Sequence, residues 1–234
     1  MQKAVCNVSV LPLRNDKAET SEMVSQMLYG EICEVLETEN RYSRICMQDG
    51  TEGWVNTLCI AKTSSDTEKT VVRESFGVFD LAEGRMLLSA GSEIEADFRF
   101  EDNQGAVRER IGNTALLFVN VPFLFGGRSF FGIDAAALVQ LVYKMHGILL
   151  PRFAAQQATQ GRLLDFIEES ECGDIAFFDD EEGNINHAGI MLSNYEILHC
   201  YGKVRIDSID SSGIFNSEQN RHTHRLRFVK SFLS

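Results

Sequence analysis

Two histidines and one aspartate have the spacing that most suggests chemistry. His187 and His199 lie 12 residues apart in apolar, strand-like runs, so a tight turn between the runs would place both imidazoles on neighbouring strands. An imidazole oriented by a second polar group can act as a general base. Asp134 precedes an apolar helical run, where a carboxylate caps the free N–H groups of a first turn. The pattern indicates a helix N-terminus and a histidine pair.

A glycine-punctuated loop leads into this helix, through Gly126, Gly127 and Gly132. A helix N-terminus lowers the pKa of a thiol and offers N–H groups to an oxyanion, which suits a cysteine nucleophile. The residue at that place is Ala135, and two more alanines follow it. The question of function therefore turns on a missing thiol.

Other residues are poor substitutes for this thiol. Cys200 adjoins His199, and successive strand side chains point to opposite faces, so Cys200 should face away from the site. Cys172 precedes no helix that could activate it, and Ser129 lies several residues upstream of position 135. We expect the six cysteines to be free thiols, because none forms a close Cys-x-x-Cys pair.

The motifs around these residues resemble those of NlpC-type cell-wall cysteine peptidases, which are papain-like. The matching segments are Leu-Phe-Gly-Gly (124–127), Gly-Ile-Asp (132–134), Gly-Asp (173–174) and His-Ala-Gly-Ile (187–190). The resemblance implies His187 as the former base, His199 as its orienting partner and Ala135 at the vestigial nucleophile position. A run of three alanines fits natural loss, or a heavily engineered chain, better than a one-residue knockout.

The resemblance also implies a peptide-binding set. In the peptidases of this type that carry SH3-like domains, the aspartate before the nucleophile helps to hold a free N-terminal L-Ala amine, which assigns Asp134 to that role. Glu22 is the acidic partner, Thr51 stands where a tyrosine is expected, and Phe125 replaces a tryptophan. The cap alone is an equally good explanation of Asp134. Arg128 and Arg152 are candidates for a peptide carboxylate, against the default of a surface arginine.

The expected fold is a small all-β SH3-like barrel, or two, followed by an α+β papain-like domain. We place an SH3-like domain at 1–60, a linker (61–70) and a second, diverged SH3-like domain within 61–114, and the papain-like domain at 115–234. A long β-rich connector is the alternative for 61–114. Within the last domain we expect a helix to about residue 146, a second helical stretch near 154–169 and then a strand meander.

The amino-acid composition narrows the classes of partner that the protein could bind. The net charge of −12 argues against nucleic acid or an anionic membrane as the main partner. No signal-like segment or 18-residue apolar run is present, so we expect a soluble protein without a transmembrane segment, in the bacterial cytoplasm, or in the cell envelope if a leader was trimmed. We expect no cofactor and no metal, because one strand pair of histidines makes no zinc site. We assign His146 to a helix end, and His222 and His224 to a basic tail.

Three functions are consistent with these residues. The first is a catalytically inactive homologue of γ-D-glutamyl-L-diamino-acid endopeptidases that binds murein peptides or a protein partner. The second is an active cysteine peptidase of that class whose nucleophile has been replaced in this chain, or which uses another nucleophile. The third is a structural or oligomerising module with a closed groove. Whether the chain is an enzyme depends on Ala135.

Overall fold

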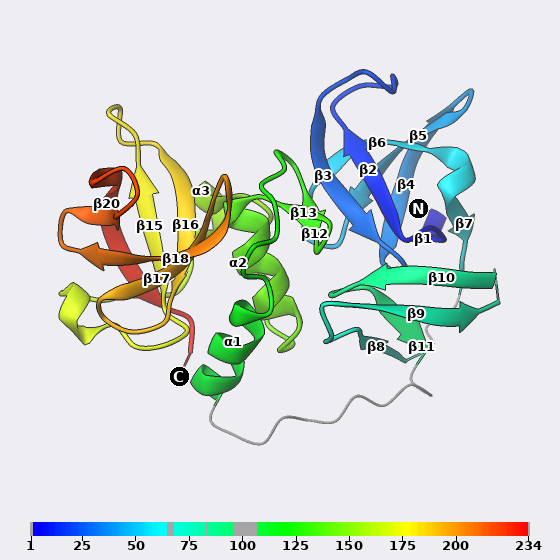
Figure 1. The fold of residues 1–234 in the computed structure, drawn as a ribbon. Helices are drawn as coiled ribbons and strands as arrows, with labels where there is room; N and C mark the ends of the chain where they lie inside the picture. The colour runs from blue at the N-terminus through cyan, green and yellow to red at the C-terminus, as the bar shows by residue number, and fades with distance from the viewer. Residues whose placement is uncertain (1, 65–67, 83, 96–106, 234) are drawn as a thin grey trace. The chain divides into compact units, whose positions relative to one another are not determined.

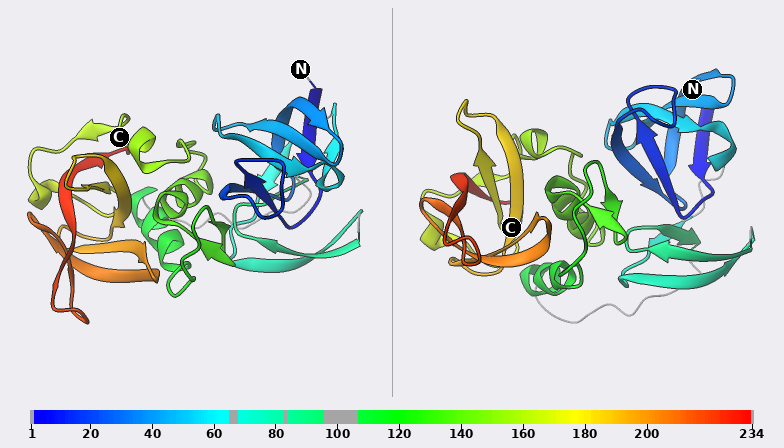
Figure 2. Two further views of the ribbon diagram at one scale, coloured as in Figure 1. Left: turned by 90° about the horizontal axis from the view of Figure 1, so that it is seen from above. Right: turned by 45° about the horizontal axis from the view of Figure 1, so that its top comes forward.

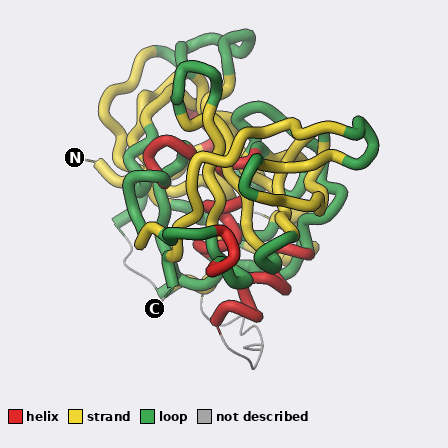
Figure 3. Tube along the Cα trace, turned by 90° about the vertical axis from the view of Figure 1, so that its left-hand side faces the viewer, coloured by secondary structure: helices red, strands yellow, loops and turns green. Residues whose placement is uncertain are grey.

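The computed structural model describes the chain except residues 1, 65–67, 83, 96–106 and 234. Two compact units divide the chain: unit 1 comprises Met1–Glu101 and Leu124–Ile133, and unit 2 comprises Asp102–Phe123 and Asp134–Ser234. Strands dominate both units, and helices are short (Figure 3).

Unit 1 begins with a seven-stranded antiparallel sheet in the order β3-β2-β6-β5-β4-β1-β7 (Figure 1). The strands are β1 (Gln2–Cys6), β2 (Val10–Arg14), β3 (Met23–Leu28), β4 (Ile32–Glu39), β5 (Tyr42–Met47), β6 (Glu52–Asn56) and β7 (Ile60–Lys62), with a 3₁₀ turn η1 (Thr57–Cys59). Alternate apolar side chains such as Leu11, Leu13 and Ile45 are fully buried and form one core. This is the small β domain expected at 1–60.

Four further strands follow in unit 1. The pairs are β8 (Lys69–Val71) with β11 (Glu93–Glu95) and β9 (Phe76–Leu81) with β10 (Gly84–Ser89). Val72, Leu88 and Ile94 form a small core of their own. A hairpin of β12 (Arg128–Ser129) and β13 (Gly132–Ile133) completes the unit. Part of the expected linker and of the strand at 94–100 lies outside the described residues, so a second barrel stays a prediction.

Unit 2 contains the helices α1 (Val107–Leu116), α2 (Ala135–Lys144) and α3 (Ala154–Gln157). The sequence analysis did not predict α1, which spans the boundary placed between residues 114 and 115. Gly112 and Asn113 lie inside this helix. A Cβ at Gly112 would lie 2.5 Å from the sulfur of Cys172, so glycine allows the helix to pack there.

The second sheet closes into a barrel. Its order is β14-β20-β15-β16-β17-β18-β19, and β20 also pairs with β19, which joins six strands in a ring (Figure 2). The strands are β14 (Arg162–Leu163), β15 (Ile175–Asp179), β16 (Ile185–Met191), β17 (Glu196–Tyr201), β18 (Lys203–Asp210), β19 (Gly213–Asn216) and β20 (Arg221–Ser231). Phe178, Met191, Ile197, Ile214 and Val229 fill its interior. Helix α2 packs against β16 and β17.

Two expectations for unit 2 were wrong in extent. The second helical stretch ends at Gln157 instead of near 169; Gly161 then adopts a φ of +76°, and only β14 and the 3₁₀ turn η2 (Ile167–Glu169) follow. The basic segment at the C-terminus is not a tail but the eleven-residue strand β20, paired with β15 and β19.

Candidate functional site

The position that the resemblance assigns to the nucleophile, Ala135, lies at the start of α2. Asp134 is the N-cap, with an extended backbone, and its Oδ1 accepts from the backbone N–H of Ala137 at 2.9 Å, which confirms the expected cap. Ala135 is therefore the first helical residue, where the N–H groups and the helix dipole favour an anion. Its methyl group is buried and offers neither a nucleophile nor a hydrogen bond.

Asp134 has a second partner that the sequence did not predict. The guanidinium of Arg152 is 1% exposed and pairs with both carboxylate oxygens, at 3.0 Å for the contact with Oδ1. Arg152 therefore does not lie on the surface to meet a peptide carboxylate. The negative charge of Asp134 is largely compensated inside unit 2.

The histidine pair forms as the sequence predicts. Gly189 on β16 stands opposite His199 on β17, which brings His187 and His199 to the same face of the sheet. Nε2 of His187 and Nδ1 of His199 are 3.0 Å apart. Both side chains are buried. Cys200 is also buried, and as the next residue along β17 its side chain points to the other face of the strand from that of His199.

A carboxylate that the sequence analysis missed completes the chain of hydrogen bonds. Oδ2 of Asp207, on β18, lies 3.0 Å from Nε2 of His199 and 2.7 Å from Nε of Arg205. Burial alone would raise the pKa of Asp207, but the hydrogen bonds from His199 and Arg205 outweigh it and lower the pKa. The ionised carboxylate fixes the proton of His199 on Nε2, so Nδ1 accepts from His187. Nδ1 of His187 is then the basic nitrogen of the relay.

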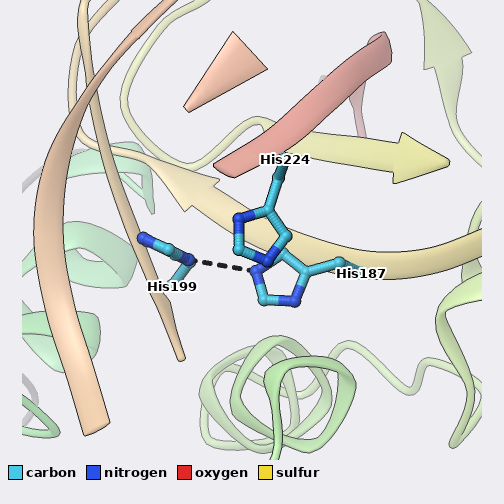
Figure 4. Close-up of side chains that lie close together, drawn as sticks. All are labelled: His187, His199 and His224. Atoms are coloured by element: carbon cyan, nitrogen blue, oxygen red, sulfur yellow. Dashed lines mark hydrogen bonds between the residues drawn. The ribbon is translucent and has the colours of Figure 1, made fainter. Parts of the chain in front are cut away.

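His224 on β20 also belongs to this site. Its ring stacks on that of His187, with centroids 4.1 Å apart and planes at 25° (Figure 4). The ring closure of the sheet explains this, because Phe178 on β15 stands opposite both His187 and Leu226. Burial lowers the pKa of His187 well below its usual range, with smaller contributions from His224 and His199. Burial and His199 also lower the pKa of His224, to about 4.

The remaining candidates from the sequence lie in unit 1. Glu22 is exposed and its carboxylate accepts from Asn15, Thr51 is buried, and Phe125 is 62% exposed. Arg128 is only 4% exposed, and its Nη1 lies 2.9 Å from both carboxylate oxygens of the buried Glu31. Arg128 therefore forms an internal ion pair with Glu31 and is not a surface cation that could bind a peptide carboxylate.

None of the six cysteines, all of which the structure describes, has an activated thiol. Burial raises the pKa of every one, to about 12 for Cys6, Cys33 and Cys200 and by less for the others, Cys46, Cys59 and Cys172. A thiol nucleophile reacts as the thiolate, which a raised pKa suppresses. The arrangement thus offers imidazoles that could act as a general base, and none of the six thiols is activated as a nucleophile.

Comparison with known proteins places both parts of the chain. Residues 120–222 match the NlpC/P60 family, and residues 13–57 match the bacterial dipeptidyl-peptidase Sh3 domain. A gamma-D-glutamyl-L-lysine dipeptidyl-peptidase of Bacillus subtilis (strain 168) is 34% identical over 98 residues, which are 41% of this chain and 33% of that relative. The chain therefore spans about a third of this curated relative.

Two further comparisons extend over more of the chain. Dipeptidyl-peptidase 6 of Lysinibacillus sphaericus is 23% identical over 81% of this chain and 85% of its own length. The crystal structure of an NlpC/P60 family protein from Bacillus cereus ATCC 10987 covers 99% of this chain and 100% of its own, with a TM-score of 0.83 at 15% identity, which shows a shared fold. In the part of the chain that the structure describes, no helix is long and apolar enough to cross a bilayer. The expected fold class is confirmed: an SH3-like region is followed by a papain-like domain that matches the NlpC/P60 family.

Proposed function

We propose that this chain is a catalytically inactive homologue of the γ-D-glutamyl-L-diamino-acid endopeptidases that acts by binding murein peptides. One observation carries the proposal: the first residue of α2 is Ala135, which has no nucleophile, and α2 packs against β16 and β17, the strands that hold the hydrogen-bonded pair His187 and His199. Loss of the nucleophile removes covalent catalysis, which costs several orders of magnitude in rate.

The six existing thiols support the same proposal. A replacement nucleophile would need a lowered pKa or an adjacent base, and burial raises the pKa of each cysteine. Cys200, next to His199 in the sequence, lies on the opposite face of β17. The basic nitrogen of His187 therefore has no thiol of this chain to deprotonate.

The peptide class rests on the relatives, one of which is named a gamma-D-glutamyl-L-lysine dipeptidyl-peptidase. The resemblance assigns Asp134 to the free amine of such a peptide. In this chain Arg152 already compensates the Asp134 carboxylate. We therefore expect an ammonium group to bind less tightly here than at an unpaired carboxylate, and a protein partner is the alternative occupant.

The test compares the unmodified chain with Ala135→Cys. Calorimetry with L-Ala-γ-D-Glu-meso-diaminopimelate measures binding, and mass spectrometry of the same samples measures cleavage. We expect the unmodified chain to bind without cleaving, and we expect Ala135→Cys to cleave slowly. His187→Ala in the Ala135→Cys background is the control, because it removes the base and should abolish any restored cleavage.

The outcomes separate the candidate functions. Cleavage by the unmodified chain would refute the proposal and point to another nucleophile. Absence of both binding and cleavage would refute the murein-peptide function and direct the search to protein partners. Cleavage by Ala135→Cys that survives His187→Ala would refute the assignment of His187 as the former base.

A further inference from the structure

Three imidazoles from three strands meet in unit 2. His187 on β16, His199 on β17 and His224 on β20 present one ring nitrogen each, and these atoms all lie within 4.8 Å of one another. Figure 4 shows the three rings gathered around a common point, with His224 above His187 and His199 to one side. The relay to Asp207 involves only two of the rings, so it does not explain why the third is there.

The surrounding groups determine which nitrogen of each ring faces this point. Asp207 occupies Nε2 of His199, which leaves Nδ1 directed inward, toward Nε2 of His187. The hydroxyl of Thr223 occupies Nδ1 of His224 at 2.9 Å, which leaves Nε2 as the inward nitrogen. In two of the three rings, the nitrogen that faces away from this point is thus hydrogen-bonded to an oxygen, as is usual for histidine ligands of metals.

The spacing is close to that of a metal site. Zn²⁺ binds imidazole nitrogen at about 2.0–2.1 Å, so nitrogens of a tetrahedral site lie ~3.3 Å apart. Nε2 of His187 and Nδ1 of His199 are 3.0 Å apart, and the third nitrogen falls within the 4.8 Å limit. An opening of a few tenths of an ångström between the first two, with a tilt of both rings toward a common point, and an approach of His224 by up to ~1.5 Å would give this geometry.

We propose that His187, His199 and His224 form a binding site for one divalent transition-metal ion of the Zn²⁺ class, with a water at the fourth position. Imidazole ligands favour Zn²⁺, Co²⁺, Ni²⁺ and Cu²⁺ over Mg²⁺ and Ca²⁺, which prefer oxygen. On binding, the proton on Nε2 of His187 moves to its Nδ1, and no other proton on the three rings has to leave. This inference is independent of the peptide-binding function.

The three histidines lie in a largely buried site that a metal ion can reach from solvent. His187 and His199 are buried, whereas His224 is partly exposed and offers a path from solvent. Phe178 and Tyr201 flank the rings.

The test uses the full chain without a histidine tag, stripped of metal with EDTA. Zn²⁺ binding is measured by calorimetry, and Co²⁺ binding by the visible absorption that a tetrahedral nitrogen site produces. We expect one ion per chain. His224→Gln should weaken binding at least ~100-fold, and Asp207→Asn should weaken it ~10–100-fold because His199 loses its orienting carboxylate.

The matched control is His222→Gln, on the same strand two residues away, where an exposed imidazole pairs with Asp210. It should change the affinity by less than ~2-fold. Circular dichroism and the barrel's thermal transition without metal establish that each variant is folded. The proposal is overturned if the stripped unmodified chain binds no Zn²⁺, if His224→Gln binds it as tightly, or if His222→Gln loses binding to the same extent as His224→Gln.

Discussion

The stability of unit 2 should fall between pH 7 and pH 5 because His224 is buried as a neutral group. Its pKa is about 4 in the folded chain, against 6.5 for an ordinary histidine. Below pH 6.5 the unfolded chain binds a proton that the folded chain does not, so acid favours unfolding. The contribution of the neutral His224 to the free energy of unfolding is complete above pH 6.5 and is lost as the pH falls toward 4.

The magnitude follows from the two pKa values. Between pH 7 and pH 5 the unfolded histidine gains nearly one proton, and the folded one gains little, which corresponds to about 2 kcal/mol. Because His224 is partly exposed, solvent screening reduces this to about 1–2 kcal/mol. His187 acts in the same direction, since burial lowers its pKa as well.

The assay is amide hydrogen exchange of β16 and β17 with EDTA present, read by mass spectrometry, because these amides report opening of the barrel alone. His224→Phe keeps a ring beside His187 and removes the titrating group. We expect the loss of opening free energy from pH 7 to 5 to be about 1–2 kcal/mol smaller in His224→Phe than in the unmodified chain, and unchanged in His222→Gln. Equal losses in all three proteins would refute the reasoning.

Three further substitutions test contacts inside each unit. Arg128→Met should destabilise unit 1 by about 3–5 kcal/mol in urea denaturation, because it removes the guanidinium that compensates the charge of the buried Glu31 carboxylate; a loss below about 1 kcal/mol would contradict this. Asp134→Ala should cost about 3 kcal/mol in hydrogen exchange of α2, more than a lost cap alone, because a buried guanidinium also loses its partner; a cost of only ~1 kcal/mol would leave just the cap. Gly126→Ala should lower the melting temperature more than Gly50→Ala, since both have positive φ but only at Gly126 would a Cβ meet a carbonyl oxygen, at 2.3 Å; equal shifts would show that φ strain alone matters.

Local patterns predicted the parts of the site that depend on neighbours in sequence. The Asp134 cap follows from one residue before an apolar helical run, and the His187–His199 pair follows from two strands joined by a tight turn. The cap and the histidine pair both depend on residues that are close in sequence. The alternation of side chains along a strand and the preference of aspartate for a helix N-cap are therefore enough to predict them.

Partners that depend on ring closure of the barrel could not be predicted in this way. His224 reaches His187 because β20 pairs with β15, whose residues lie about 50 positions earlier in the chain. Its basic neighbours, among them Arg225 and Arg227, made the segment look like a solvated tail. Arg225 instead forms an ion pair with the buried Asp179, across the β15–β20 pairing. Asp207 was missed for another reason: it stands opposite Ile197 and reaches His199 diagonally across the β17–β18 pair, which a lone aspartate in an alternating strand does not indicate.

The helix α1 was missed for a different reason. Gly112 and Asn113 are turn residues by propensity, and the helix forms because Ile111 and Ala115 are fully buried on one face. Arg152 was likewise assigned to the surface by its type, although it is buried against Asp134. In both cases tertiary burial decided the outcome over local preference.

The most direct test of the account is titration of the unmodified chain with L-Ala-γ-D-Glu-meso-diaminopimelate by calorimetry, with the peptide analysed afterwards for cleavage. The account predicts saturable binding and an intact peptide, because Ala135 stands at the head of α2 and no thiol of the chain is activated. Release of L-Ala-D-Glu from the unmodified chain would contradict it.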